Sequence, residues 1–292
     1  MFALRQLGLV VHPTRRIDSV LDAISTWAAA HDVAVGQVPV AGQAREVAEA
    51  VDAGDCDLLL AVGGDGTALH ALREGAAVSR PVLAVACGSI GMLTAVGAEG
   101  VVAALDQVAA GRFTAEPIPG LEVKCPDLPI GVAVNDVAVV RAGPGQIMVS
   151  IRVDDELYAR AVGDGVVVAS ALGSSAYSMA AGGPILAAGV EGMVVTALES
   201  HGGCTPPLVV GPGAEVDLHI EPGYGGARLE FDGQIEDEQP TELRLARVED
   251  HATLVALGDA ESLIAGLRRR RILIDSPRVL ARDDRKRLGD AS

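Results

Sequence analysis

The sequence predicts an α/β domain, in which a parallel sheet carries helices on both faces, followed by a β-rich domain. Strand-like and helix-like segments alternate over the first third of the 292 residues, which is typical of parallel sheets covered by helices. From about Gly120 the segments are strand-like and rich in glycine, and a helical period returns only near the carboxyl end. We therefore expect an α/β domain over residues 1–118 and a β-rich domain over residues 119–260. A terminal helix and a charged tail over residues 261–292 should pack back on the first domain.

The spacing of apolar residues predicts the elements of the first domain. Apolar runs predict strands at residues 6–12, 33–40, 56–64 and 81–88. Apolar residues at helical spacing predict helices at residues 17–32, 44–54, 67–76 and 98–112. Ligands of such sheets bind beyond the carboxyl ends of the strands. Functional residues are therefore expected directly after Val62, where the most apolar strand ends.

Turn residues separate the strand-like runs of the second domain. These runs lie at residues 120–125, 130–143, 147–162, 164–172, 208–234 and 241–257. Asp154 and Asp155 interrupt one of them and predict a hairpin. A helical period returns at residues 260–274 and includes four consecutive arginines, which are expected to form a solvated helix end.

The charge balance excludes some classes of partner. The formal net charge is −16, which argues against a nucleic-acid-binding surface and against association with an anionic membrane. The sequence shows no signal peptide and no long uninterrupted apolar stretch, so we expect a cytoplasmic protein. Lys124 and Lys286 are the only lysines. Phosphate groups must therefore be bound by arginine, backbone amides or a metal.

The first chemical motif is Gly63-Gly64-Asp65-Gly66-Thr67, which follows the apolar run and opens a helix. Glycines allow backbone N–H groups to approach an anion, and the start of a helix adds a positive dipole end. An aspartate within such a loop suits a metal ion or a hydroxyl group that is about to attack. The alternative is an ordinary Asp-Gly turn with no ligand.

Three further segments combine glycine with polar residues. Asp164-Gly165 precedes the hydroxyl-rich stretch 173–178 and Gly182-Gly183-Pro184, where small residues let a ligand approach and hydroxyls can contact ribose or base edges. The alternative is a glycine-rich corner between a strand and a helix. Asn135-Asp136 interrupts a strand-like run, an unfavourable place for polar residues. A second glycine turn, residues 87–94, follows a predicted strand. No G-x-S-x-G nucleophile elbow is present.

Taken in order, these segments resemble the NAD kinase family. That family has a G-G-D-G-T loop, a G-N-L-G-F-L turn, an N-E or N-D pair, a D-G, a T-P-T-G-S-T-A-Y-S loop and a G-G-P. The resemblance extends to a histidine-containing segment before R-P-L-V-V and to a D-G-Q turn, and it covers roughly residues 5–275. The matching segments here are 63–67, 88–93, 135–136, 164–165, 170–178, 182–184, 200–210 and 231–234.

The resemblance implies two domains with an active site between them and transfer of the γ-phosphoryl of ATP to the 2′-hydroxyl of the adenosine ribose of NAD. It implies that Asp65 orients or deprotonates that hydroxyl near a Mg²⁺ ion, with no fixed protein ligand of the metal assigned. The partners implied are NAD, ATP and further copies of the chain in a homodimer or homotetramer. The phosphate-binding residues implied are Gly63, Gly64, Gly66 and Thr67. The acceptor-binding residues implied are Asn135, Asp136, Asp164, Ser175, Ala176, Tyr177 and His201, with Ser89, Met92, Ser178 and Gln234 as further pocket residues.

Several positions depart from the family pattern. Where the family has asparagine and phenylalanine, this sequence has Ser89 and Met92. Where the family has Pro-Thr and arginine, it has Ala171-Leu172 and Pro206. Two alternatives therefore stay open: a kinase of the same superfamily with another hydroxyl acceptor, such as a small molecule or a lipid, and a non-catalytic nucleotide-binding regulator. ATP or polyphosphate as the donor, and NAD or NADH as the acceptor, are also left open by the sequence.

Overall fold

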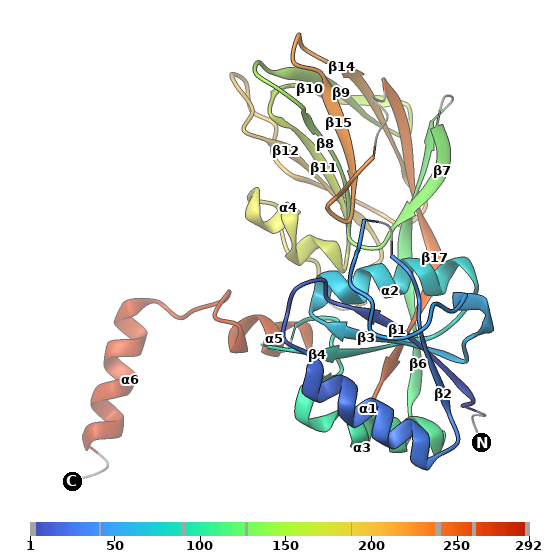
Figure 1. Cartoon of the computed structure of the whole chain (residues 1–292). Coiled ribbons are helices and arrows are strands. Elements are labelled where there is room, and N and C mark those ends of the chain that lie inside the picture. The colour runs from blue at the N-terminus through green and yellow to red at the C-terminus, as the bar shows by residue number, and fades with distance from the viewer. Residues whose placement is uncertain are drawn as a thin grey trace. The chain divides into compact units, whose positions relative to one another are not determined.

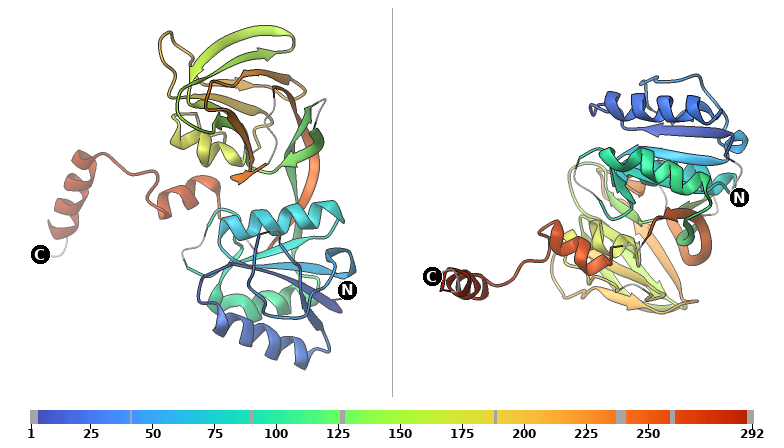
Figure 2. Two further views of the ribbon diagram at one scale, coloured as in Figure 1. Left: turned by 45° about the horizontal axis from the view of Figure 1, so that its top comes forward. Right: turned by 90° about the horizontal axis from the view of Figure 1, so that it is seen from below.

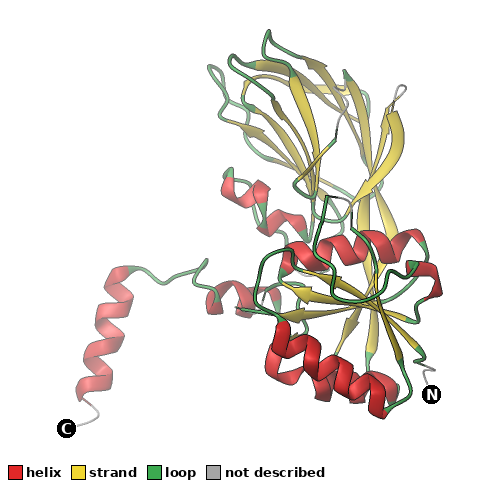
Figure 3. Cartoon of the chain, viewed as in Figure 1, coloured by secondary structure: helices red, strands yellow, loops and turns green. Residues whose placement is uncertain are grey.

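The fold is taken from a computed structural model of the chain, which describes residues 4–40, 42–88, 91–125, 128–187, 189–236, 241–258 and 261–289. The chain divides into two compact units, Met1–Gly258 and Asp259–Ser292. Within the first unit, helices and strands mix in the amino-terminal part, whereas the remainder is almost entirely strands (Figure 3). The predicted fold class, an α/β part followed by a β-rich part, is confirmed.

The α/β part is a parallel sheet with helices on both faces (Figure 1). Its strands are β1 (Gln6–Val11), β2 (Ala34–Gln37), β3 (Leu58–Gly63), β4 (Val82–Ala86) and β5 (Val96–Gly97). Its helices are α1 (Asp18–Ala30), α2 (Asp65–Ala77) and α3 (Val101–Ala109). Helix α2 lies on one face of the sheet, and α1 and α3 lie on the other (Figure 1, Figure 2).

Strand β3 shows why this sheet forms. Leu58, Leu60 and Val62 pack with α1 and α3, whereas Leu59 and Ala61 pack with α2. All five side chains are buried, as a continuous apolar run predicts for a strand covered on both faces. Because β1, β3 and β4 run parallel, their carboxyl ends open at the same edge of the sheet. The loops that follow these strands therefore lie side by side.

The helix predicted over residues 44–54 is wrong. This segment is not an α-helix: it bends at residues 47–48 and leads into a 3₁₀ turn at Ala53–Asp55. Ala50 bridges Gln37 of β2 in parallel. The buried Gln37 amide also donates to the Arg45 carbonyl and accepts from the Val47 N–H, both at 2.7 Å. Pairing with the sheet edge therefore satisfies backbone groups that a helix would satisfy internally, and tertiary context overrides helical spacing.

The β-rich part packs two sheets around a shared apolar core (Figure 1). One sheet runs in the order β13-β12-β11-β8-β15-β16, and the other continues the α/β sheet through β4-β17-β14-β9-β10. Strand β17 joins both parts, since its Leu254 pairs with Val82 of β4. The strands are β6 (Thr114–Cys125), β7 (Leu128–Ala133), β8 (Asp136–Arg141), β9 (Ile147–Val153), β10 (Glu156–Gly163), β11 (Gly165–Ser170), β12 (Met193–Leu198), β13 (Leu208–Val210), β14 (Glu215–Glu221), β15 (Ala227–Phe231), β16 (Gln234–Ile235) and β17 (Glu242–Ala256).

The hairpin predicted around Asp154 and Asp155 is confirmed between β9 and β10. Both turn residues have positive φ, 49° and 64°, which is the backbone of a two-residue turn that matches the strand twist. A short helix, α4 (Tyr177–Ala180), follows β11. Ala181, at the end of α4, packs against the face of the smaller sheet that points away from the shared core.

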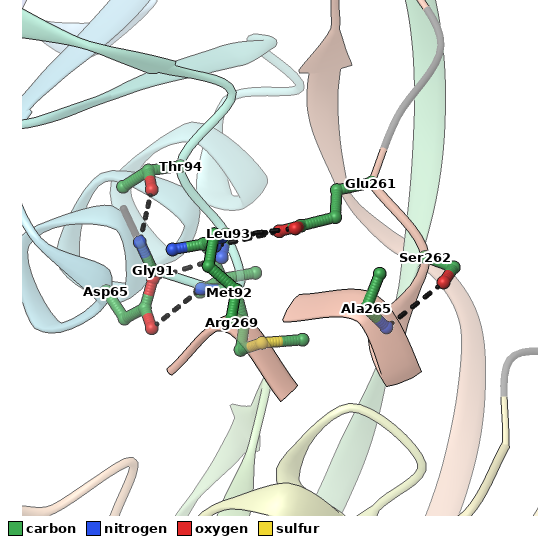
Figure 4. A network of polar contacts seen from close by, with 9 residues as sticks. All are labelled: Asp65, Gly91, Met92, Leu93, Thr94, Glu261, Ser262, Ala265 and Arg269. Carbon is green, nitrogen blue, oxygen red and sulfur yellow. Dashed lines mark hydrogen bonds and ion pairs between the residues drawn. The ribbon is translucent and has the colours of Figure 1, made fainter. Parts of the chain in front are cut away.

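The second unit contains α5 (Leu263–Arg269) and α6 (Pro277–Gly289). Ser262 caps α5 by accepting a hydrogen bond from the Ala265 N–H at 3.2 Å (Figure 4). Arg269 pairs with Glu261, and Arg268 pairs with Asp275, each at 2.8 Å. The predicted packing of this segment on the first domain stays a prediction. None of the helices in the described part of the chain is long and apolar enough to cross a membrane.

Candidate active site

The glycine loop, residues 63–67, joins the carboxyl end of β3 to the start of α2. Gly63 is required by packing, since an added Cβ would lie 2.7 Å from the Cβ of the buried Thr67 and 3.1 Å from that of His12. Gly66 is different: it is exposed, and an added Cβ would meet nothing within 4 Å. Internal packing therefore gives no reason for glycine at Gly66, but the approach of a ligand to the first N–H groups of α2 does.

Asp65 is the first residue of α2, and its carboxylate links the two glycine turns of this edge. The N–H groups of Met92 and Leu93 each donate to one of its oxygens at 3.0 Å (Figure 4). A side chain at Gly91 would overlap this carboxylate, so the second turn needs glycine for Asp65 to sit here. Met92, a predicted pocket residue, meets Asp65 through its backbone. Ser89, predicted beside it, lies outside the described residues.

The Asn135-Asp136 pair lies where β7 ends and β8 begins. The buried carboxylate of Asp232 accepts hydrogen bonds from the N–H groups of Val134, Asn135 and Asp136, at 3.0, 2.6 and 3.2 Å. The Tyr177 N–H donates to the carboxyl group of Asp136. Three predicted site residues, Asn135, Asp136 and Tyr177, are thus brought together, and Asp232 holds their backbone. The sequence placed Asp232 only within a D-G-Q turn and assigned it no role.

Burial, together with the neighbouring carboxylates of Asp232 and Glu230, raises the pKa of Asp136 to about 7, against the lowering effect of the Tyr177 N–H. The side chain is almost fully buried. A buried carboxyl group without a cationic partner is costly to ionise, so near neutral pH Asp136 is poised between its two protonation states.

Asp136→Asn is expected to remove a pH dependence of stability. The folded pKa of Asp136, about 7, lies above its reference value of 3.8. The contribution of the Asp136 carboxyl group to the free energy of unfolding is therefore fully present below pH 3.8 and is lost as the pH rises through about 7. Urea unfolding at pH 5 and pH 8 should show that the wild type loses more stability than the variant over this interval. Equal losses in both proteins would contradict the shifted pKa.

The hydroxyl-rich loop has both buried and accessible members. Ser178 is fully buried and exchanges a hydrogen bond with Thr196 of β12 at 2.9 Å, so its hydroxyl holds α4 on the sheet. Ser175 donates to the Leu172 carbonyl at 3.2 Å and is half-buried, as is Ala176. Tyr177 is exposed. Within this loop Tyr177 therefore has the side chain most open to a ligand.

Two cavities lie beside these residues. A small one of about 50 Å³ is lined by Gly66, His70 and Arg73 of α2 and by Asp232 and Gln234 of the turn between β15 and β16. Arg73 Nη2 donates to the Phe231 carbonyl at 3.0 Å and lies 3.9 Å from Asp232. This cavity joins the glycine loop to the predicted Gln234. Arg73 was not predicted from the sequence.

An open cavity of about 300 Å³ includes Arg141, Asp164, Tyr177 and Arg228 in its lining. Asp164 accepts a hydrogen bond from Arg141 Nε at 2.7 Å. His201, predicted for the same pocket, is exposed, and its backbone N–H donates to the Val162 carbonyl at 2.7 Å. His201 is not among the residues that line either cavity.

Comparisons with known proteins match both parts of the chain. The ATP-NAD kinase N-terminal domain model matches residues 8–113, and the ATP-NAD kinase C-terminal domain model matches residues 134–256. The NAD kinase of Halorubrum lacusprofundi is 35% identical over 217 residues, which are 70% of this chain and 76% of that protein. The NAD kinase of Natronomonas pharaonis is 40% identical over 88 residues, 29% of this chain and 32% of that protein. For this and two further curated NAD kinases, the match spans about a third of their length.

Two solved structures share the fold. The yeast NADH kinase complexed with NADH superposes with a TM-score of 0.74 at 22% identity, over 91% of this chain and 86% of that chain. The NAD kinase from Archaeoglobus fulgidus in complex with ATP superposes with a TM-score of 0.70 at 23% identity, over 90% of this chain and 98% of that chain. At these identities the likeness establishes the fold.

Proposed function

Because the chain belongs to the NAD kinase family of phosphotransferases, we propose that it transfers the γ-phosphoryl of ATP to the 2′-hydroxyl of the adenosine ribose of NAD and forms NADP. The observation that supports this most directly is the position of Asp65. Its carboxylate stands at the first turn of α2, where the exposed Gly66 leaves room for phosphate. The donor phosphate and Asp65, the proton acceptor, would thus lie side by side at the start of α2.

The donor phosphates bind the N–H groups at the start of α2. The first N–H groups of a helix have no intrahelical acceptors and form the positive end of the helix dipole. Phosphoryl transfer needs alignment and charge neutralisation more than covalent chemistry by the protein. Residues 63–66 supply such an anion-binding edge, and the open space beside Gly66 lets the phosphates approach the backbone closely.

Asp65 orients the 2′-hydroxyl and accepts its proton. A carboxylate has about four acceptor positions, and the N–H groups of Met92 and Leu93 hold the two oxygens in a fixed orientation. Such a group within hydrogen-bond reach of the acceptor hydroxyl serves as a general base.

The residues present fit a Mg²⁺ ion that arrives with the nucleotide. Mg²⁺ is commonly held by one or two carboxylates together with substrate phosphates and water, and Asp65 would be the protein ligand. The described residues contain no cluster of three or more acidic, histidine or cysteine side chains that would form a separate metal cage. When bound, the ion neutralises the charge of the phosphates.

The acceptor dinucleotide binds along Asn135, Asp136 and Tyr177, with Asp164 at the neighbouring cavity. The reacting hydroxyl belongs to the adenosine ribose, so NAD and NADH present the same acceptor atom. Of the two, we propose NAD as the substrate. We also propose a cytoplasmic homodimer or homotetramer as the working form, in line with the family resemblance. Light scattering of the purified chain tests the oligomeric state.

The full chain, incubated with Mg²⁺-ATP and NAD⁺, is expected to form NADP⁺, which an enzymatic cycling assay measures. Parallel reactions with NADH and with polyphosphate define the acceptor and the donor. ADP released without a phosphorylated dinucleotide, when other hydroxyl compounds are supplied, would favour a different acceptor. Tight nucleotide binding without any ADP would favour a regulator. Either result would reject the proposed reaction.

A further inference from the structure

The turn after β1 brings an arginine to the glycine loop. The His12 N–H donates to the Val62 carbonyl at 3.0 Å, which fixes the start of this turn beside the end of β3. Arg15 Nη1 then donates to the Cys87 carbonyl, directly after β4, at 2.8 Å. An arginine that follows one strand thus reaches across the edge where β1, β3 and β4 all end.

The guanidinium of Arg15 lies close to both glycine turns. A Cβ added at Gly64 would lie 3.6 Å from Arg15 Nη1, and one added at Gly88 would lie 2.9 Å from it. Gly88 has a φ of 141°, which other residues rarely adopt. The distance at Gly64 is an ordinary contact, which places the guanidinium directly beside the glycine loop, whereas at Gly88 a side chain would take the space that the guanidinium occupies.

The backbone of this turn is held by other side chains. Arg45 Nη1 donates to the carbonyls of His12 and Arg15 at 3.1 and 2.6 Å. His12 Nδ1 accepts from the N–H groups of Thr14 and Arg15, each at 3.2 Å. Burial lowers the pKa of His12, and the positive charges of Arg15 and Arg45 lower it further, which favours the neutral ring that can accept these bonds. The turn is thereby set in one conformation although it is exposed.

The Arg15 guanidinium also has more N–H donors than the one hydrogen bond to Cys87 uses. A guanidinium carries five N–H groups, and the Cys87 carbonyl is the acceptor found for Arg15 among the described residues. No acidic side chain in the described ranges lies within ion-pair distance of it, in contrast to Arg141 and Arg228, which pair with Asp164 and Glu230. The charge of Arg15 is therefore available to an anion at the glycine loop.

We propose that Arg15 binds the phosphates of the phosphoryl donor where they meet the glycine loop. This assignment rests on the proposed function and adds a substrate-binding residue that the motifs do not include. Arginine suits the task, because its planar fork binds phosphate oxygens in pairs and keeps its charge at all working pH values. The role is consistent with the scarcity of lysine: Lys124 pairs with Glu122 in the β-rich part, and Lys286 lies in α6.

Arg15→Ala is expected to weaken the binding of two ligands, the Mg²⁺ complex of the β,γ-imido analogue of ATP and inorganic tripolyphosphate. Each affinity should fall by about 10- to 100-fold, the effect of losing a charge-assisted hydrogen bond. Calorimetry measures both ligands. In turnover, the KM for ATP should rise by a similar factor while the KM for NAD stays within about twofold. Arg15→Lys should restore part of the affinity, because it keeps the charge but loses the fork.

Arg16→Ala is the matched control, since Arg16 is the next residue, is exposed and carries the same charge. It should leave both affinities unchanged, and thermal melting should show that all variants are folded. Equal losses in Arg15→Ala and Arg16→Ala, wild-type binding by Arg15→Ala, or a rise in the KM for NAD alone would each overturn the assignment. Arg15-dependent tripolyphosphate binding without any NADP formation would uphold the assignment and reject the proposed function.

Discussion

Asp65→Asn is expected to reduce NADP formation by about 10²- to 10⁴-fold, the contribution typical of a general base. The amide has almost the same shape as the carboxylate, but it cannot accept the proton of the 2′-hydroxyl and has no charge for Mg²⁺. The KM for NAD should change less than kcat, because the lost interaction is made chiefly in the transition state. Initial rates at saturating ATP and NAD⁺ measure this effect.

Asp65→Asn has a structural consequence that must be measured separately. An asparagine oxygen can still accept one of the two N–H groups of Met92 and Leu93, but its NH₂ group must face the other. We expect a loss of about 1–3 kcal/mol in the free energy of unfolding, which urea titration measures. A variant that is folded, binds the ATP analogue and does not turn over would identify a chemical role.

Asp32→Asn is the matched control for Asp65→Asn. Asp32 is exposed and has a φ of 56°, a backbone region that asparagine also tolerates. Its replacement removes the same charge from the chain and should leave the turnover rate unchanged. Near-normal turnover by folded Asp65→Asn would contradict the assigned role, because the proton would then have another acceptor.

Local patterns predicted those parts of the fold that local chemistry determines. The run Leu58–Val62 is apolar at every position and is buried on both faces as β3. Gly63–Thr67 follows it as the loop that begins α2. Asp154 and Asp155 form the predicted turn of a hairpin. In each case the residues that determine the conformation are neighbours in the sequence, so the sequence pattern is sufficient.

The features that the sequence did not predict depend on residues far apart in the chain. Asp232 accepts N–H groups from residues 96 to 98 positions earlier. Arg15 reaches a carbonyl 72 positions later. The misassigned helix at residues 44–54 has suitable spacing, but the edge of β2 and the Gln37 side chain offer its backbone other partners. A local sequence pattern does not contain these pairings, because the residues become neighbours only in the folded chain.

Gly173→Ala is expected to destabilise the protein by about 3 kcal/mol or more, the upper range for overpacking at a buried site. An added Cβ would overlap the carbonyl oxygen of Asn135 and lie 2.7 Å from its Cα. This backbone cannot yield easily, because the same carbonyl accepts the Ser170 N–H at 2.8 Å and Ser170 Oγ donates to the Val134 carbonyl at 2.7 Å. Urea unfolding of the variant measures the loss.

Gly211→Ala separates this steric effect from the general effect of replacing glycine. Gly211 is exposed, and a Cβ added there meets nothing within 4 Å. Its replacement should be neutral or should stabilise by about 0.4–1 kcal/mol through a less flexible unfolded chain. If a folded fraction of Gly173→Ala is recovered, its KM for NAD should rise, since the Asn135 backbone leads directly into Asp136 and its bond to the Tyr177 N–H. Equal stability of the two variants would show that the fold accommodates a Cβ at Gly173 and would contradict the expected overlap with Asn135.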